Sequence, residues 1–168
     1  MGFLGFDAIA ATRRNHALEH AAVTVLLERG GFRSSLAGRS TPNGFYIYGA
    51  VAKDDLSSAV DEGLRRLQRG EEEWAVSPFC GTNLAMTGIL AAMSVLSVTG
   101  PSVLAKNKLP NAIIAAVVSA VAAQPLGRLA QKYITTSPHV NGLRVTEISA
   151  LSLGSLGYYW VSTEHAAT

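Results

Sequence analysis

The segment NHALEH, residues 15–20, carries two histidines and one glutamate close together. On an α-helix, side chains four residues apart lie on one face, about 5 to 6 Å apart at their Cβ atoms. His16 and His20 can therefore share one metal ion, with Glu19 beside them. Two neutral imidazoles suit zinc, and a nearby carboxylate can act as general base on water whose pKa zinc lowers to about 7. This H-x-x-E-H order is the signature of the inverted zincins.

The alternative is a helix whose two polar histidines bind nothing. Histidines four residues apart arise often by chance, and a pattern of five residues is a weak motif. The rest of the chain must therefore supply further ligands and a fold that positions them.

Composition divides the chain into a charged front and an apolar middle. Of the 168 residues, 48% are hydrophobic and only 15% are charged, whereas an average soluble domain has about 25% charged residues. Charged residues are absent from Trp74 to Ala105 and from Leu109 to Gly127. The net charge of +2 comes from scattered residues, which argues against nucleic-acid binding. The single cysteine, Cys80, excludes an intrachain disulfide.

The front, residues 1–80, predicts a small α+β domain of helix, strand and helix. Apolar residues at helical spacing place the histidines on a helix that Thr12 or Asn15 caps and that ends near Arg29 at a Gly-Gly pair. A turn-rich piece, AGRSTPNG, leads into FYIYGAV, which is typical of a strand and of one arm of a hairpin. A second amphipathic helix, DLSSAVDEGLRRLQRG, is expected to end at Gly70.

The middle, residues 81–130, predicts a transmembrane helical hairpin with spans at about 83–105 and 109–127. A membrane-spanning helix needs about 20 apolar residues, and the many small residues suit close helix packing in lipid. The lipid bilayer is then a partner of this chain. Basic residues on both flanks favour soluble ends in the cytoplasm. The alternative is a pair of buried core helices.

The tail, residues 131–168, is expected to pack back on the N-terminal domain. Its alternating pattern and aromatic run predict a β-hairpin that turns at residues 154–157. A third interfacial or transmembrane helix is the alternative. His165, near the end of the sequence, is expected to be disordered.

Residues 12–70 resemble the start of the pitrilysin/insulysin family of zinc peptidases. There an H-x-x-E-H helix is followed by a glycine-containing turn, a strand or hairpin, and a second helix. Here the order is HALEHAAVTVLLERGG, SLAGRSTPNGFYIYGAV and KDDLSSAVDEGLRRLQ. The resemblance implies that His16 and His20 bind zinc and that Glu19 is the catalytic base. That family draws its third ligand from a later glutamate, for which Glu71 is the first counterpart here. The chain departs from that family in its small size.

The whole chain is similar to a family of small uncharacterised membrane proteins from photosynthetic and filamentous bacteria. The similarity rests on NHALEH, RLQRGE and the SPFCGTN run before the apolar hairpin. It covers nearly the whole length and implies an integral protein of the bacterial inner membrane. It implies no mechanism.

Three residues are candidates for completing a zinc site with the histidine pair. Glu71 ranks first by the peptidase resemblance; its alternative is a solvated acidic run with its two neighbours. Cys80 and His139 flank the apolar hairpin, which would bring both to one side of the bilayer. Their alternatives are a small buried apolar residue and a solvated loop histidine.

The sequence thus leads to two hypotheses. In the first, the chain is a membrane-anchored, zinc-dependent hydrolase, plausibly a peptidase, with a membrane protein or peptide as substrate. In the second, it is a non-catalytic membrane subunit or assembly factor with a structural metal site or none. The two differ over Glu19, which only the hydrolase needs as a base.

Overall fold

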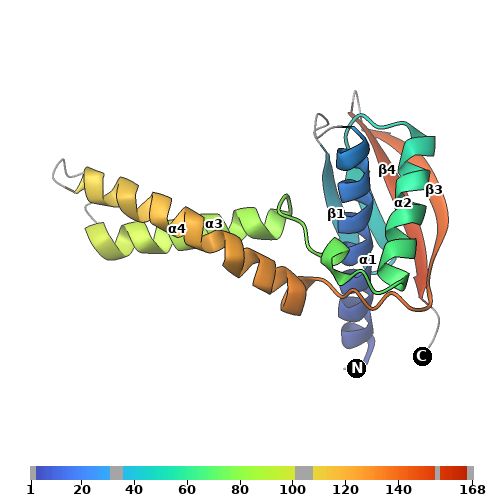
Figure 1. Cartoon of the computed structure of the whole chain (residues 1–168), viewed down its shortest axis with the longest axis horizontal. Helices are drawn as coiled ribbons and strands as arrows, with labels where there is room; N and C mark the ends of the chain where they lie inside the picture. Colours follow the sequence, from blue (N-terminus) through green and yellow to red (C-terminus); the bar gives the residue numbers. More distant parts are fainter. Residues whose placement is uncertain (1–2, 31–35, 101–107, 154–155, 166–168) are drawn as a thin grey trace. The chain divides into compact units, whose positions relative to one another are not determined.

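A computed structural model describes residues 3–30, 36–100, 108–153 and 156–165 (Figure 1). The chain forms two compact units: unit 1 comprises residues 1–77 and 135–168, and unit 2 comprises residues 78–134. The helices are α1 (Phe3–Arg29), α2 (Lys53–Gln68), α3 (Gly81–Thr99) and α4 (Leu109–Ala130), with a 3₁₀ turn η1 (Glu72–Ala75) and a π-helical turn η2 (Gln131–Thr135). The strands are β1 (Ala37–Thr41), β2 (Gly44–Tyr48), β3 (Leu143–Leu153) and β4 (Leu156–His165).

Unit 1 is an α+β domain, as expected. Its four strands form one antiparallel sheet in the order β1-β2-β4-β3. The two strands predicted for the tail are confirmed as β3 and β4, so the helical alternative for the tail is wrong. The expected turning residues Gly154 and Ser155 lie outside the described residues.

Helices α1 and α2 cover one face of this sheet (Figure 1). Alternate residues of β2 and β4 point toward them, so that Phe45, Ile47 and Val161 are fully buried in a shared core with both helices. The two helices approach closely at Gly63 of α2. A Cβ atom there would lie 2.9 Å from the Cβ of Ala21 in α1. Glycine at this position sets the distance between the helices.

The segment AGRST forms strand β1, whereas the sequence suggested only a turn-rich piece. Its residues pair in register with β2, from Ala37 opposite Tyr48 to Thr41 opposite Gly44. The turn is confined to Pro42 and Asn43. Thr41 is the one β-branched residue of the segment, which has no aromatic residue. Pairing with β2 therefore stabilises a strand that local preference alone does not favour.

The first helix begins at Phe3, well before the predicted caps at Thr12 or Asn15. Asn15 does not cap the helix. Its side chain is fully buried, donates to the carbonyls of Thr41 and Pro42 at 2.9 and 3.1 Å, and accepts from Thr163 at 2.9 Å. A polar residue within a helical run reads as a cap in sequence, but here it attaches α1 to the sheet.

His165 is ordered, contrary to expectation. It is the last residue of β4 and pairs with Leu143 of β3. A residue near the end of a sequence is ordered when its backbone joins a sheet ladder.

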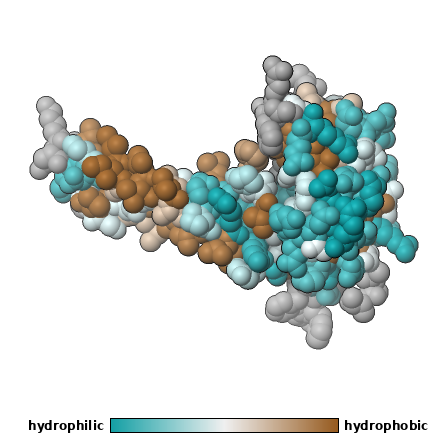
Figure 2. Space-filling view, viewed as in Figure 1, coloured by the Kyte–Doolittle hydropathy of each residue, from teal (hydrophilic) through white to brown (hydrophobic). Residues whose placement is uncertain are grey.

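Unit 2 is an antiparallel helical hairpin of α3 and α4. The first predicted span is shifted: α3 covers Gly81–Thr99, and residues 101–105 lie outside the described part of the chain. The second predicted span is α4, which continues to Ala130. Both helices are long and apolar enough to cross a membrane, and only 6% of the apolar window in α3 is buried and 22% of that in α4. Figure 2 shows much of the hairpin surface as hydrophobic. A pair of core helices would be mostly buried instead.

Polar side chains join α3 to α4 inside this apolar hairpin. Ser119 donates to Ser94 at 2.5 Å, and Gln131 donates to the side-chain oxygen of Asn83 at 3.1 Å. Asn83 lies against Gly127, where any Cβ atom would overlap its amide oxygen. Small residues therefore bring the two helices close together, as is usual for helices that pack in lipid.

Candidate metal site at the histidine pair

His16 and His20 lie on one face of α1, as the four-residue spacing predicts. Their ring centroids are 4.3 Å apart, with the rings tilted by 58°. Their nearest metal-binding atoms lie within 4.8 Å of each other. Two nitrogens bound to one tetrahedral zinc lie about 3.4 Å apart, since each Zn–N bond is about 2.0 to 2.1 Å long.

Each ring is oriented by a backbone carbonyl. The Nδ1 atom of His16 is 2.9 Å from the carbonyl oxygen of Thr135, and that of His20 is 2.8 Å from the carbonyl oxygen of Ala75. A carbonyl only accepts, so we assign the ring proton to Nδ1 in both histidines. Each Nε2 atom then carries the lone pair. Zinc-binding histidines are usually held in this way, with the other ring nitrogen donating to a carbonyl or carboxylate.

The Nε2 atom of His20 is the unusual atom of the site. His20 is only 3% exposed, and this nitrogen has no hydrogen-bond partner among the described residues. Leaving a buried polar atom without a partner costs about 1 to 3 kcal/mol. A buried lone pair of this kind is suited to a cation or to the proton of a bound ligand.

The carbonyls that orient the histidines belong to the connectors between the units. Ala75 closes η1, which Arg66 of α2 fixes by stacking 4.0 Å over the ring of Trp74. Thr135 directly follows Ile134, the last residue of unit 2. Beyond it, the guanidinium of Arg13 donates to the carbonyl of Thr136 at 3.0 Å. Both connectors are thus attached to α1 where they enter or leave unit 1.

Glu19 is buried on the side of α1 that faces β1. Its carboxylate accepts a hydrogen bond from Ser40 at 2.5 Å. It also lies against Gly38, where a Cβ atom would approach its Oε1 atom to 2.1 Å. Glycine at position 38 and serine at position 40 therefore give this carboxylate both its space and a donor.

Glu71 and His139 take other roles in unit 1. The Glu71 carboxylate is 2.9 Å from the guanidinium of Arg69 and 3.7 Å from that of Arg66. His139 is exposed in the loop that precedes β3. Neither belongs to a cluster of three or more metal-binding side chains within the described ranges. The structure therefore does not favour the ranking of Glu71 as first choice for third ligand.

Cys80 lies near the start of unit 2 and is the N-cap of α3. Its sulfur accepts a hydrogen bond from the backbone N–H of Thr82 at 3.4 Å. Thr82 and Asn83 are residue types that favour the cap position, but both lie within the first turn of the helix.

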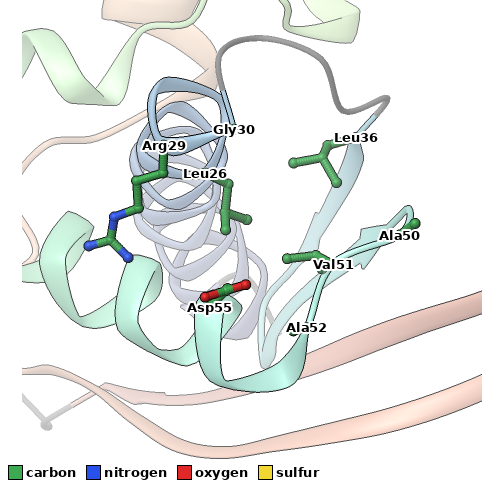
Figure 3. A pocket seen from close by; sticks show the side chains of 8 residues that line it. All are labelled: Leu26, Arg29, Gly30, Leu36, Ala50, Val51, Ala52 and Asp55. Carbon is green, nitrogen blue, oxygen red and sulfur yellow. The ribbon is translucent and has the colours of Figure 1, made fainter.

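Two cavities lie elsewhere in unit 1. One of about 310 Å³ lies between the end of α1 and the start of α2 and is lined in part by Leu26 and Asp55 (Figure 3). The other, of about 720 Å³, lies along the first half of α1 and includes Arg14 and His165. Neither is lined by the histidine pair or by Glu19.

Sequence reasoning missed the groups that surround the H-x-x-E-H residues. The carbonyls of Ala75 and Thr135 leave no trace in the sequence, because every residue has a carbonyl. Ser40 and Gly38 are ordinary residue types in a short strand. Gly38 and Ser40 are two residues apart in β1 and therefore lie on the same face of the strand, toward α1. The sequence contains no other sign that they act together.

Comparisons with known proteins show the family of this chain. Residues 11–148 match the family described as a domain of unknown function, DUF6391. The chain belongs to this family. It is also 36% identical over 148 residues to an uncharacterized protein of Picosynechococcus sp., a match that covers 82% of this chain and 71% of the relative. No solved structure matches the chain.

The DUF6391 match extends from α1 into β3. It therefore takes in the histidine pair, Glu19 and the α3–α4 hairpin together. The expected membership in an uncharacterised bacterial family is confirmed.

Proposed function

We propose that this chain is a membrane-anchored zinc protein of the inverted-zincin type that acts as a hydrolase on peptides. The observation that carries the proposal is the buried Nε2 atom of His20, which has no hydrogen-bond partner among the described residues. It is adjacent to His16, and both rings donate through Nδ1 to backbone carbonyls. Two Nε2 atoms whose lone pairs are oriented in this way suit zinc.

Cys80 is our choice for the third ligand, because chain connectivity keeps it near the pair. It lies five residues after Ala75, whose carbonyl is bonded to His20. Five residues of extended chain span at most about 17 Å, so the thiolate can reach the histidines. Glu71 is less suited because two arginines already neutralise it, and exposed His139 remains the weaker alternative.

Glu19 is the residue we assign as general base. When bound, zinc lowers the pKa of water to about 7. Glu19 takes the proton of the attacking water and returns it to the leaving amine, so its charge is restored after each cycle. Ser40, which donates to Oε2 of Glu19, would hold this carboxylate in place.

The α3–α4 hairpin is the proposed membrane anchor. Its support is the two apolar helices with little buried surface. We propose the bacterial inner membrane as its location, with both ends of unit 1 in the cytoplasm, because basic residues on both sides of the hairpin favour that orientation.

A second function has one specific observation in its favour. The hydrogen bond of 2.5 Å from Ser40 ties the Glu19 carboxylate to β1. In a non-catalytic subunit or assembly factor, Glu19 would only join α1 to the sheet, beside a structural metal site.

Replacing Glu19 by Gln separates the two functions. Purified protein in detergent, loaded with zinc, would be incubated with a peptide mixture, and cleavage would be followed by mass spectrometry. We expect Glu19→Gln to retain its metal and its fold while hydrolysis falls at least 100-fold, in line with the usual effect of losing a general base. Glu28→Gln, at an exposed site on the same helix, is the matched control. Absence of hydrolysis from the wild type would favour the second function, whereas hydrolysis that persists in Glu19→Gln would contradict the role of Glu19 as the base.

A further inference from the structure

One face of the sheet in unit 1 is open. Helices α1 and α2 both pack on the other face (Figure 1). Within the described part of unit 1, no helix packs against the outward residues of the four strands. This open face is made of alternate residues of β1, β2, β4 and β3.

Four aromatic side chains gather at the centre of the open face. Tyr46 and Tyr48 come from β2, and Tyr158 and Trp160 from β4. The ring centroids of Tyr46 and Trp160 are 4.5 Å apart, and those of Tyr48 and Tyr158 are 5.4 Å apart. All four are partly exposed. Large aromatic residues at this density are typical of the centres of protein interfaces.

The pairing register arranges the open face in rows across the strands. One row runs from Arg39 on β1 through Tyr46 and Trp160 to Ser149 on β3. Glu147 lies two residues from Ser149 on the same edge, and its carboxylate accepts from the Ser149 hydroxyl at 2.7 Å. Along this row, the face has a positive group at β1, an aromatic centre and a negative group at β3. Farther along the strands, Arg144 of β3 lies opposite Glu164 of β4, which adds one charge of each sign. Arg39 and Glu147 are exposed and have no ion-pair partner among the described residues.

This order of groups is self-complementary. Rotating a second copy by 180° about an axis parallel to the strands lays its β3 edge over β1 of the first copy. Arg39 of each copy then faces the Ser149 and Glu147 edge of the other, and Tyr46 faces Trp160. Such a two-fold contact uses the same patch on both subunits, and stacked sheets pack about 10 Å apart.

We propose that the open face binds the open face of a second copy of this chain. Other occupants fit less well. An anionic bilayer surface or a nucleic acid would be met by several basic residues, whereas this row has one arginine and an exposed glutamate beside it. One face of a single four-stranded sheet makes a small interface, so the expected dissociation constant in detergent is on the order of micromolar.

Charge reversal at the two edges tests the proposal on the full chain. Sedimentation in detergent would measure dimerisation of wild type, Arg39→Glu and Glu147→Arg. Each reversal puts like charges together at both symmetric contacts, so each variant should dimerise about tenfold or more weakly. An equimolar mixture of the two variants should form heterodimers as strong as the wild-type dimer, because every edge contact is then attractive again. Native mass spectrometry would distinguish them by mass.

Lys53→Glu and Asp61→Arg are the matched controls, since both residues are exposed on α2 in the helix layer. Circular dichroism would confirm that all variants are folded. A wild type that is monomeric up to about 100 times the expected micromolar dissociation constant, or that binds vesicles through this face as a monomer, would overturn the proposal. So would a dimer that neither reversal weakens, because its interface would then lie elsewhere.

Discussion

At the scale of single residues, two buried polar side chains of α1 differ in how their groups are satisfied. Asn15 uses both ends of its amide in hydrogen bonds to the sheet. His20 uses only Nδ1, and its buried Nε2 has no partner among the described residues. A satisfied buried group is explained by stability. Stability does not explain the buried Nε2 atom of His20, and we propose that this atom binds a ligand.

Asn15→Ala should destabilise unit 1 by about 2 to 4 kcal/mol, because it leaves the carbonyls of Thr41 and Pro42 and the buried hydroxyl of Thr163 without this partner. Denaturant unfolding followed by tryptophan fluorescence would measure this. Thr12→Ala, which removes only a bond within the helix, is the control. Equal stability of the two variants would contradict the role assigned to Asn15.

His165 should make stability depend on pH. Burial, and then the positive charge of Arg14, lower its pKa from 6.5. The folded state therefore favours the neutral ring, and this contribution is complete above pH 6.5 and is lost as the pH falls through the lowered pKa. The melting temperature of wild type should fall relative to that of His165→Gln between about pH 7.5 and about pH 5. Parallel curves for the two proteins would show that the ring is not desolvated in the folded state.

At the scale of elements, contact between α1 and α2 depends on Gly63. Alanine in a helix is normally more stable than glycine by about 1 kcal/mol. Here its Cβ would lie 2.9 Å from the Cβ of Ala21 and 3.0 Å from the backbone nitrogen of Ala22. We expect Gly63→Ala to destabilise unit 1 by roughly 1 to 3 kcal/mol, because the helices must separate.

Gly88→Ala in α3 is the matched control, since the described residues leave the space around its Cβ open. The melting temperatures of both variants would be measured, and only that of Gly63→Ala should fall below that of the wild type. A gain of stability in Gly63→Ala would mean that α1 and α2 are not packed as described.

The elements differ in how well the sequence predicts them. The amphipathic stripe of α2 and its end at Gly70 were predictable, because helical period and glycine preference act locally. Strand β1 was not predictable, because its residues AGRST become a strand only by pairing with β2. The start of α1 was not predictable either. Asn15 is a typical cap residue, but its side chain bonds to strands that follow it in sequence.

At the scale of the whole molecule, unit 2 is inserted between α2 and β3 of unit 1. Composition predicted the apolar insert, and the alternating pattern of the tail predicted its two strands. It could not predict that β4 would pair between β2 and β3, because pairing between distant segments leaves no local signal. For the site, the sequence predicted the histidine pair on one helix face. It could not predict the carbonyls that orient the pair, which belong to Ala75 and Thr135 of unit 1, on either side of the insert in sequence.

The most direct test of the account is the metal content of the whole chain. The protein would be purified in detergent without chelators, and bound metals would be measured by mass spectrometry, together with His16→Ala, His20→Ala and Cys80→Ser. The account predicts about one zinc per chain, lost in both histidine variants and weakened in Cys80→Ser. The exposed histidine variant His139→Ala should keep its zinc. A wild type without stoichiometric metal, although folded, would contradict the account and leave NHALEH as a structural helix.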